Sequence, residues 1–156
     1  MRFSLSTEYA IHGLLFLALH PQDAVVMLPE VARALRVSEP SLRKVFQTLA
    51  RRGLVISYRG TKGGYSLGMA PHVITLEDVV QAIEGTSLLY QCMSAHGQCD
   101  PGPQCVIGSA FQEVEEHMAA ALRRITLADL VARVRDGSKK VQWLVPISAG
   151  HEVPSS

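Results

Sequence analysis

Residues 28–67 constrain the fold more than any other part of the chain, because two short helical patterns lead directly into a glycine-rich hairpin pattern. Apolar residues recur at helical spacing in 28–35 and again in 39–52, and Ser38 between them is a favourable N-cap. Two short helices joined by a tight turn are typical of a helix-turn-helix, whose second helix enters the major groove of DNA. An ordinary helix pair with a solvated basic face gives the same pattern, so the helices alone leave both interpretations open.

The hairpin pattern favours the DNA-binding interpretation. Residues 54–58 and 65–67 have the composition of strands, and the turn between them contains two cations and three glycines. A β-hairpin directly after a recognition helix is a wing, and glycine lets its backbone approach a phosphate or lets an arginine enter a narrow minor groove. The predicted DNA contacts are Ser38, Pro40, Ser41, Arg43, Lys44, Arg59, Gly60, Lys62, Gly63 and Gly64.

The charges are distributed unevenly along the chain. Residues 1–70 contain nine Lys and Arg against four Asp and Glu, whereas residues 71–156 contain six against ten. The first part therefore carries a net charge of +5 and the second −4, which agrees with the overall +1. The basic part is the one that we expect to face an anionic partner.

The N-terminal residues predict a helix that begins at Ser6 or Thr7 and ends at Pro21. Its apolar run of about nine residues is shorter than the roughly 20 that a membrane span needs. Glu8 and His12, on consecutive turns, give it a polar stripe, and it lacks the small residues of a signal-peptide cleavage site. We therefore expect an amphipathic helix of a cytoplasmic protein without membrane contact.

The second half predicts a capped helix over residues 75–84, a long helix over 106–124 and a short helix from Thr126. The long helix has an apolar stripe that needs a cover, formed by Ile107, Phe111, Val114, Met118 and Leu122. The same helix of a second subunit is one cover, and folding back onto its own domain is the alternative. A homodimer would place two recognition helices about one DNA turn apart, on a pseudo-palindromic operator.

These patterns predict a mainly α fold with a small β-hairpin wing, in which a winged helix-turn-helix is followed by a long dimerisation helix. We divide the chain into a DNA-binding region (1–70), a connecting helix and linker (71–91), a cysteine loop (92–105), dimerisation helices (106–136) and a partly disordered tail (137–156).

All three cysteines, Cys92, Cys99 and Cys105, lie in that loop. An odd number of cysteines in a reducing compartment argues against a disulfide framework. The spacing is not the paired C-x2-C of common zinc modules, although His96 could supply a fourth zinc ligand. Thiolates in a loop rich in Gly and Pro also suit an iron–sulfur cluster. Spacing alone leaves the cluster, zinc and cluster-free thiol chemistry open.

Short motifs spread over roughly residues 1–135 carry a resemblance to a known family. They are Met1-Arg2-Phe3, Glu8-Tyr9-Ala10, Val37-Ser38, Arg59-Gly60, Gly63-Gly64-Tyr65, residues 75–79, the cysteine loop and residues 125–130. On these motifs the chain resembles the Rrf-two family of bacterial winged-helix transcription regulators, of the IscR, NsrR, RirA and RsrR type. The likeness implies a homodimeric DNA-binding repressor or dual regulator with an iron–sulfur cluster on the three cysteines, and no enzymatic activity. A relative reads bases partly with an acidic residue at the position of Arg43, so its operator does not carry over.

The fourth ligand of the implied cluster differs between the types of the family. IscR-type members use a histidine three residues after the third cysteine, where this chain has Gly108. NsrR-type members use an acidic residue of the first helix from the other subunit, which corresponds to Glu8. RsrR-type members combine two cysteines with a Glu and a His of that helix, which correspond to Glu8 and His12.

The resemblance therefore implies either three cysteines with Glu8 and a [4Fe–4S] cluster, which is favoured, or two cysteines with Glu8 and His12 and a [2Fe–2S] cluster. Loss or modification of the cluster would report redox state, nitric oxide, oxygen or iron. Two alternatives stay open for the first helix: Glu8 as a partner of the helix dipole, and His12 as a partly buried polar residue.

Overall fold

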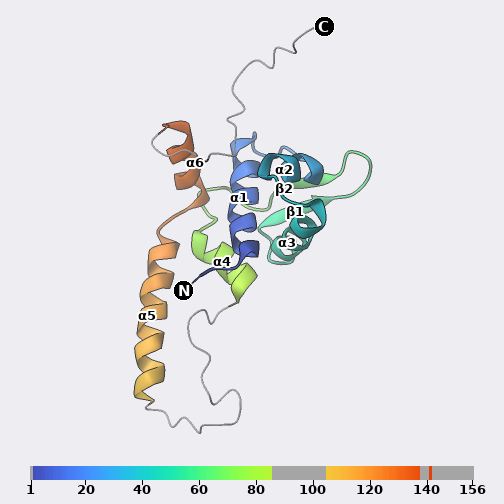
Figure 1. The fold of residues 1–156 in the computed structure, drawn as a ribbon. Helices are drawn as coiled ribbons and strands as arrows, with labels where there is room; N and C mark the ends of the chain where they lie inside the picture. Colours follow the sequence, from blue (N-terminus) through green and yellow to red (C-terminus); the bar gives the residue numbers. More distant parts are fainter. Residues whose placement is uncertain (1, 86–104, 138–140, 142–156) are drawn as a thin grey trace.

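The computed structural model describes residues 2–85, 105–137 and 141. The described parts form six helices and one two-stranded antiparallel hairpin, so the predicted fold class is confirmed (Figure 1). In chain order the elements are α1 (Leu5–Leu19), α2 (Leu28–Leu35), α3 (Glu39–Arg51), β1 (Val55–Tyr58), β2 (Gly64–Leu67), α4 (Leu76–Glu84), α5 (Val106–Arg123) and α6 (Leu127–Arg135).

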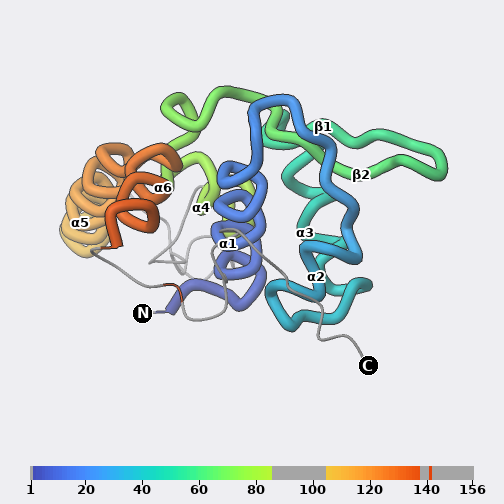
Figure 2. Tube along the Cα trace, turned by 90° about the horizontal axis from the view of Figure 1, so that it is seen from above, coloured from blue at the N-terminus to red at the C-terminus, as the bar shows by residue number. Residues whose placement is uncertain are grey.

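Helix α1 is the centre of the fold. It packs against α2, α3, α4, α6 and β2, and Figure 2 shows it between the helix-turn-helix on one side and α5 and α6 on the other. Residues 13–18 are all buried, so the predicted amphipathic helix is wrong for this half of α1. The physical reason is that α6 returns from far along the chain and covers a face that the pattern assigned to solvent.

The start of α1 also differs from the prediction. Ser4, and not Ser6 or Thr7, is the N-cap, and its hydroxyl accepts a hydrogen bond from the Thr7 backbone N–H. Thr7 is fully buried inside the helix instead, where its hydroxyl donates to Glu84 at the end of α4. This contact spans most of the chain, and local capping rules contain no information about it.

The turn between α2 and α3 is tight because Arg36 adopts a left-handed conformation with φ 54°. This conformation lets the Val37 N–H close the end of α2 on the Ala32 carbonyl at 3.0 Å. Ser38 occupies the predicted N-cap position of α3, but its hydroxyl donates to the Ser41 hydroxyl at 2.7 Å and not to the backbone.

The hairpin is held to the body of the protein by a third extended segment. Tyr65 of β2 exchanges two backbone hydrogen bonds, of 2.8 and 2.9 Å, with Val26. A Cβ atom at Gly64 would collide with the Val26 carbonyl oxygen, so this approach requires glycine. The root of the wing is therefore fixed, while its turn projects away from the core (Figure 1).

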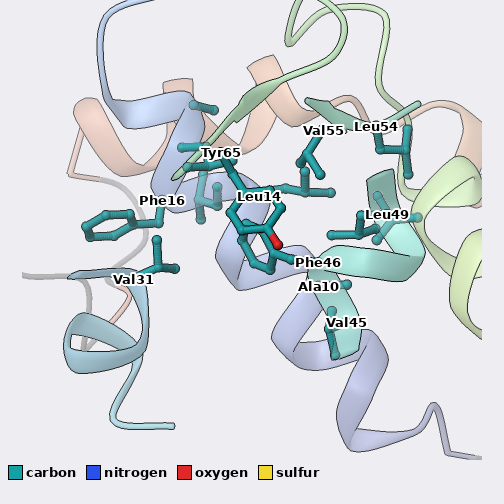
Figure 3. Packing of buried hydrophobic residues seen from close by; sticks show 14 of the residues in the cluster. Ala10, Leu14, Phe16, Val31, Val45, Phe46, Leu49, Leu54, Val55 and Tyr65 are labelled. Atoms are coloured by element: carbon teal, nitrogen blue, oxygen red, sulfur yellow. The ribbon is translucent and has the colours of Figure 1, made fainter. Parts of the chain in front are cut away.

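The core joins α1 to the recognition helix and the wing. Phe46 of α3 packs edge-on against Tyr65 of β2 with ring centroids 4.9 Å apart, and Leu14 of α1 lies beside them (Figure 3). A Cβ atom at Gly13 would lie 2.6 Å from the Phe46 ring, so α1 and α3 are in direct contact there. Buried residues of α4 and α6 belong to the same core.

Helices α4 and α6 begin with a repeated motif, I-T-L-x-D-x-V, at residues 74–80 and 125–131. In both copies the threonine and the aspartate form a capping box. Thr75 and Thr126 also pair in an antiparallel bridge, and two backbone hydrogen bonds of 2.8 and 2.9 Å join the segments. The two helix starts are thereby fastened to each other.

Helix α5 packs against α4 along part of its length, and its N-terminal end projects away from α1 (Figure 1). None of its residues is buried. Its other end is anchored where Arg123 makes a two-pronged ion pair with Glu77 of α4, at 2.5 and 2.7 Å. Three members of the predicted apolar stripe, Ile107, Phe111 and Val114, are exposed. None of the described helices combines the length and apolar character that a membrane span requires.

Candidate nucleic-acid interface and metal centre

The solvent side of α3 and the turn of the wing carry the predicted DNA contacts. Burial of Leu42, Phe46 and Leu49 on the opposite side of α3 fixes which residues point outward. We define the reading face as the exposed members of the predicted set, which are Ser38, Pro40, Ser41, Arg43, Lys44, Arg59, Gly60 and Lys62.

A groove of about 380 Å³ lies between the start of α3, the start of α2 and the wing. It brings together Arg43 of α3 with Arg59, Gly60, Gly63 and Gly64 of the wing. The other five predicted contacts lie outside its lining. The recognition helix and the wing are thus joined by one concave, partly basic surface.

Arg43 is not an isolated cation. Its guanidinium donates to the Glu39 carboxylate one turn earlier on α3, and both side chains are about half exposed. The i, i+4 spacing was visible in the sequence, but the pair was not predicted. Glu39 orients Arg43 along the helix and lines the same groove.

Three of the predicted wing contacts, all glycines, have a structural explanation. A Cβ atom at Gly63 would lie 2.5 Å from the Tyr58 carbonyl oxygen, and Gly64 is buried against Val26. Gly60 has φ 102° and accepts a turn hydrogen bond from the Gly63 N–H at 3.0 Å. The three glycines therefore shape the wing, and their contact with DNA stays a prediction.

Of the predicted metal ligands, Cys105 is the described cysteine, whereas Cys92, Cys99 and the zinc candidate His96 lie outside the described residues. Cys105 is the N-cap of α5, and its half-buried sulfur accepts a hydrogen bond from the Gly108 N–H at 3.4 Å. The position where IscR-type members carry a histidine therefore lies directly beside this sulfur.

Glu8 and His12 lie on one face of α1, as predicted, with Oε1 and Nε2 3.8 Å apart. Burial lowers the pKa of His12 below its ordinary value, against the opposing attraction of Glu8. The imidazole is therefore neutral near pH 7, which is the form that binds metals.

A thiolate, a carboxylate and a neutral imidazole are donors that iron accepts, so the described residues fit an iron–sulfur site. Within the described residues, no group of three or more His, Cys, Asp or Glu side chains converges on one point. The end of α5 that begins at Cys105 projects away from α1, which carries Glu8 (Figure 1).

Comparison with known proteins was made by family and by structure. A family model described as "Iron-dependent Transcriptional regulator", Rrf2, matches residues 3–133. The chain belongs to the Rrf2 family. A curated relative, the HTH-type transcriptional regulator IscR of Yersinia enterocolitica, is 33% identical over 84% of this chain and 79% of its own length. The IscR of Serratia proteamaculans is 32% identical over the same shares.

Solved structures agree with this assignment. The structure titled T. potens IscR is 27% identical, covers 92% of this chain and 96% of its own, and superposes with a TM-score of 0.70. The structure of CymR, titled the global cysteine regulator of B. subtilis, is 26% identical, covers 86% and 98%, and has a TM-score of 0.69. This Rrf2 chain is accordingly a DNA-binding transcriptional regulator with a winged helix, and not an enzyme.

Proposed function

We propose that this Rrf2 regulator is a homodimeric repressor that binds a pseudo-palindromic operator and responds to the state of an iron–sulfur cluster. The observation that carries the proposal is the position of α1. This helix bears the candidate ligand Glu8 at one end and contacts the recognition helix through Gly13 and Phe46. A change at the ligand end therefore acts on the element that holds α3.

In the proposed DNA complex the start of α3 enters the major groove and the wing follows the backbone or the minor groove. The residues proposed for the major groove are Ser38, Pro40, Ser41, Arg43 and Lys44. Those proposed for the DNA backbone or the minor groove are Arg59, Lys62 and the three glycines of the turn. Arginine pairs best with guanine, so Arg43 favours a guanine at the base that it faces.

In the proposed metal site the three cysteines and Glu8 hold a [4Fe–4S] cluster, and two cysteines with Glu8 and His12 would instead suit [2Fe–2S]. Such a cluster supplies a redox-active iron group that oxidants, nitric oxide and iron shortage can alter. Glu8 is an exposed carboxylate. A carboxylate ligand is displaced from iron more easily than a thiolate, and a cluster that is easily altered suits a sensor.

The regulatory step is a shift between two arrangements of the dimer. Glu8 of one subunit and the cysteines of the other would hold the cluster jointly and so link α1 to the cysteine loop at residues 92–105, which we call the thiol segment. Loss of the cluster would break this link and change the spacing of the two reading faces. Forms with and without the cluster must then differ in operator affinity, because binding shifts an equilibrium only through differential affinity.

The ligand assignment is tested with Cys92→Ala, Cys99→Ala and Cys105→Ala proteins purified without oxygen. Each variant is expected to lose most of the visible iron–sulfur absorption and most of its iron and sulfide. Wild-type absorption in all three variants would contradict the assignment.

The reading face is tested by binding to operator and to random duplex over a range of salt concentrations. Arg43→Ala should weaken discrimination between bases by about 1–3 kcal/mol. Lys62→Ala should weaken binding to both duplexes alike and reduce the dependence of the binding constant on salt by about one released ion. Wild-type behaviour of both variants would contradict this docking.

A second candidate function is a regulator that uses the cysteines directly, or through zinc, without a cluster. The similarity to the B. subtilis structure titled the global cysteine regulator favours it. Metal and sulfide analysis of anaerobic protein separates the two, because this candidate predicts colourless protein with no inorganic sulfide.

A further inference from the structure

The first turn of α1 is capped by a residue from the far end of α4. Glu84 Oε1 accepts a hydrogen bond from the Ser4 backbone N–H at 2.7 Å and a second from the Thr7 hydroxyl at 2.5 Å. Ser4 is the N-cap and Thr7 is the third helical residue. Glu84 is the last residue of α4.

This arrangement is a capping box made between two helices. In a local capping box, a Glu or Gln at the third helical position takes the N–H of the N-cap residue. Here Thr7 occupies that position and has no carboxylate, and Glu84 supplies it from α4. The hydrogen bonds from Thr7 and then Ser4 lower the pKa of Glu84, so the ionised group is the one that fits.

The position of this contact relates it to the proposed metal site. Glu8 follows Thr7 directly, and its backbone N–H is bonded to the Ser4 carbonyl at 3.3 Å. Gly85, with φ 90°, follows Glu84 directly and leads toward the thiol segment. The carboxylate therefore fastens the turn that carries Glu8 to the end of α4, which precedes the thiol segment in the sequence.

We propose that Glu84 is a positioning residue for Glu8: its carboxylate holds the first turn of α1, which carries Glu8, against the end of α4. This inference rests on the proposed iron–sulfur function. The same helix contacts α3 further along, since a Cβ atom at Gly13 would lie 2.6 Å from the Phe46 ring.

The experiment compares Glu84→Ala, Glu84→Gln and Thr7→Val with wild type, and uses Glu113→Ala, an exposed glutamate of α5, as the matched control. The first measurement is the anaerobic rate at which the visible iron–sulfur absorption decays with a chelator present. Glu84→Ala should lose it at least about 10-fold faster. Glu84→Gln should stay within about 2-fold of wild type, because its amide oxygen accepts both hydrogen bonds.

Thr7→Val removes one donor without changing the buried volume and should accelerate the loss by an intermediate factor. The double variant Thr7→Val/Glu84→Ala should be no faster than Glu84→Ala, because both changes break the same contact. The second measurement is hydrogen exchange of the Thr7 and Glu8 amides in protein without iron. Only the variants that break the contact should lose protection there.

The outcomes separate this inference from the function on which it rests. A wild type without any iron–sulfur absorption overturns the proposed function and this inference together. A wild type with absorption, and variants that lose it at the wild-type rate, overturns the role of Glu84 alone. If Glu84→Ala does not fold, Thr7→Val decides by the same two measurements.

Discussion

Gly13 has no side chain, and this allows the close approach of α1 and α3. Its position in the middle of α1 is unfavourable for helix stability by about 1 kcal/mol relative to alanine. The contact with Phe46 explains the residue, since a Cβ atom there would lie within 2.6 Å of the aromatic ring. The close approach of α1 and α3 is the reason for glycine.

We predict that Gly13→Ala destabilises the protein by about 1–3 kcal/mol, because the ring of Phe46 must move within a packed core. Urea unfolding followed by circular dichroism measures this change. Gly108→Ala is the control, since a Cβ atom there meets the nearest side-chain atoms at an ordinary 3.6 Å, and it should be neutral or stabilising. Equal effects of the two substitutions would contradict the steric explanation.

Gly108 also offers a test of the ligand set at a single residue. A side chain placed there starts 3.6 Å from the Cys105 sulfur. If the proposed cluster is bound, Gly108→His should add a ligand, and Glu8→Ala should then weaken cluster retention less in Gly108→His than in wild type. Iron content and decay of the visible absorption measure this, with Gly108→Ala as the control. An equal effect of Glu8→Ala in both backgrounds would contradict it.

At the scale of helices, the starts of α1 and α6 both depend on ionised carboxylates. Hydrogen bonds from the Thr126 backbone and hydroxyl lower the pKa of Asp129 from its ordinary 3.8, and those from Thr7 and Ser4 lower the pKa of Glu84 from 4.5. Since the folded pKa lies below the unfolded one, these groups stabilise the fold above about pH 4.5. The contribution is lost as the pH falls through their folded values.

We therefore predict that Glu84→Gln flattens the acid limb of the stability curve. The free energy of unfolding of wild type should fall between pH 4.5 and pH 3 more steeply than that of the variant, because glutamine takes up no proton. Urea unfolding at a series of pH values measures both slopes. Parallel curves would mean that Glu84 does not titrate differently in the folded and unfolded states.

The helices and the hairpin could be predicted from sequence because their signals are local. Threonine caps, glycine stops and apolar periodicity all act within a few residues, and they placed α4 and α5 to within one residue. What could not be predicted depends on contacts between distant residues. The start of α1 at Leu5, the burial of its residues 13–18 and the role of Glu84 each require α4 or α6 to be in place.

Only part of the candidate site could be predicted from the sequence. The shared face of Glu8 and His12 and the exposure of Arg43 and Lys44 follow from helical spacing alone. The structural need for Gly64 does not, because it arises from the Val26 backbone, which comes from elsewhere in the fold, whereas the need for Gly63 arises within the hairpin, from the Tyr58 carbonyl oxygen. Glycine at both positions therefore has two possible explanations, the steric requirement of the fold and contact with DNA.

At the scale of the whole molecule, the wing and α5 lie on opposite sides of the central helix (Figure 2). Helix α5 has no buried residue, and its apolar side chains Ile107, Phe111 and Val114 are exposed in the single chain. The proposed dimer would cover this surface and leave both reading faces free to meet DNA.

We predict that Phe111→Glu converts the dimer to a monomer at micromolar concentration and weakens operator binding at least about 100-fold, because the second reading face no longer binds within the same complex. Sedimentation and DNA titration measure the two effects. Gln112→Glu places the same charge on the neighbouring position, away from the apolar stripe, and should leave the assembly intact. Dissociation by both substitutions would contradict the assignment of this surface.

The paired threonines at residues 75 and 126 have a consequence for how such a regulator can diversify. The stretch between the end of α4 and Thr126 is fastened at its start by Glu84 and at its finish by this bridge. Lengthening a loop between fixed ends costs little, about 0.6 kcal/mol for each doubling. Insertions between the end of α4 and the start of α5 are therefore expected to leave the helix-turn-helix and the wing in place.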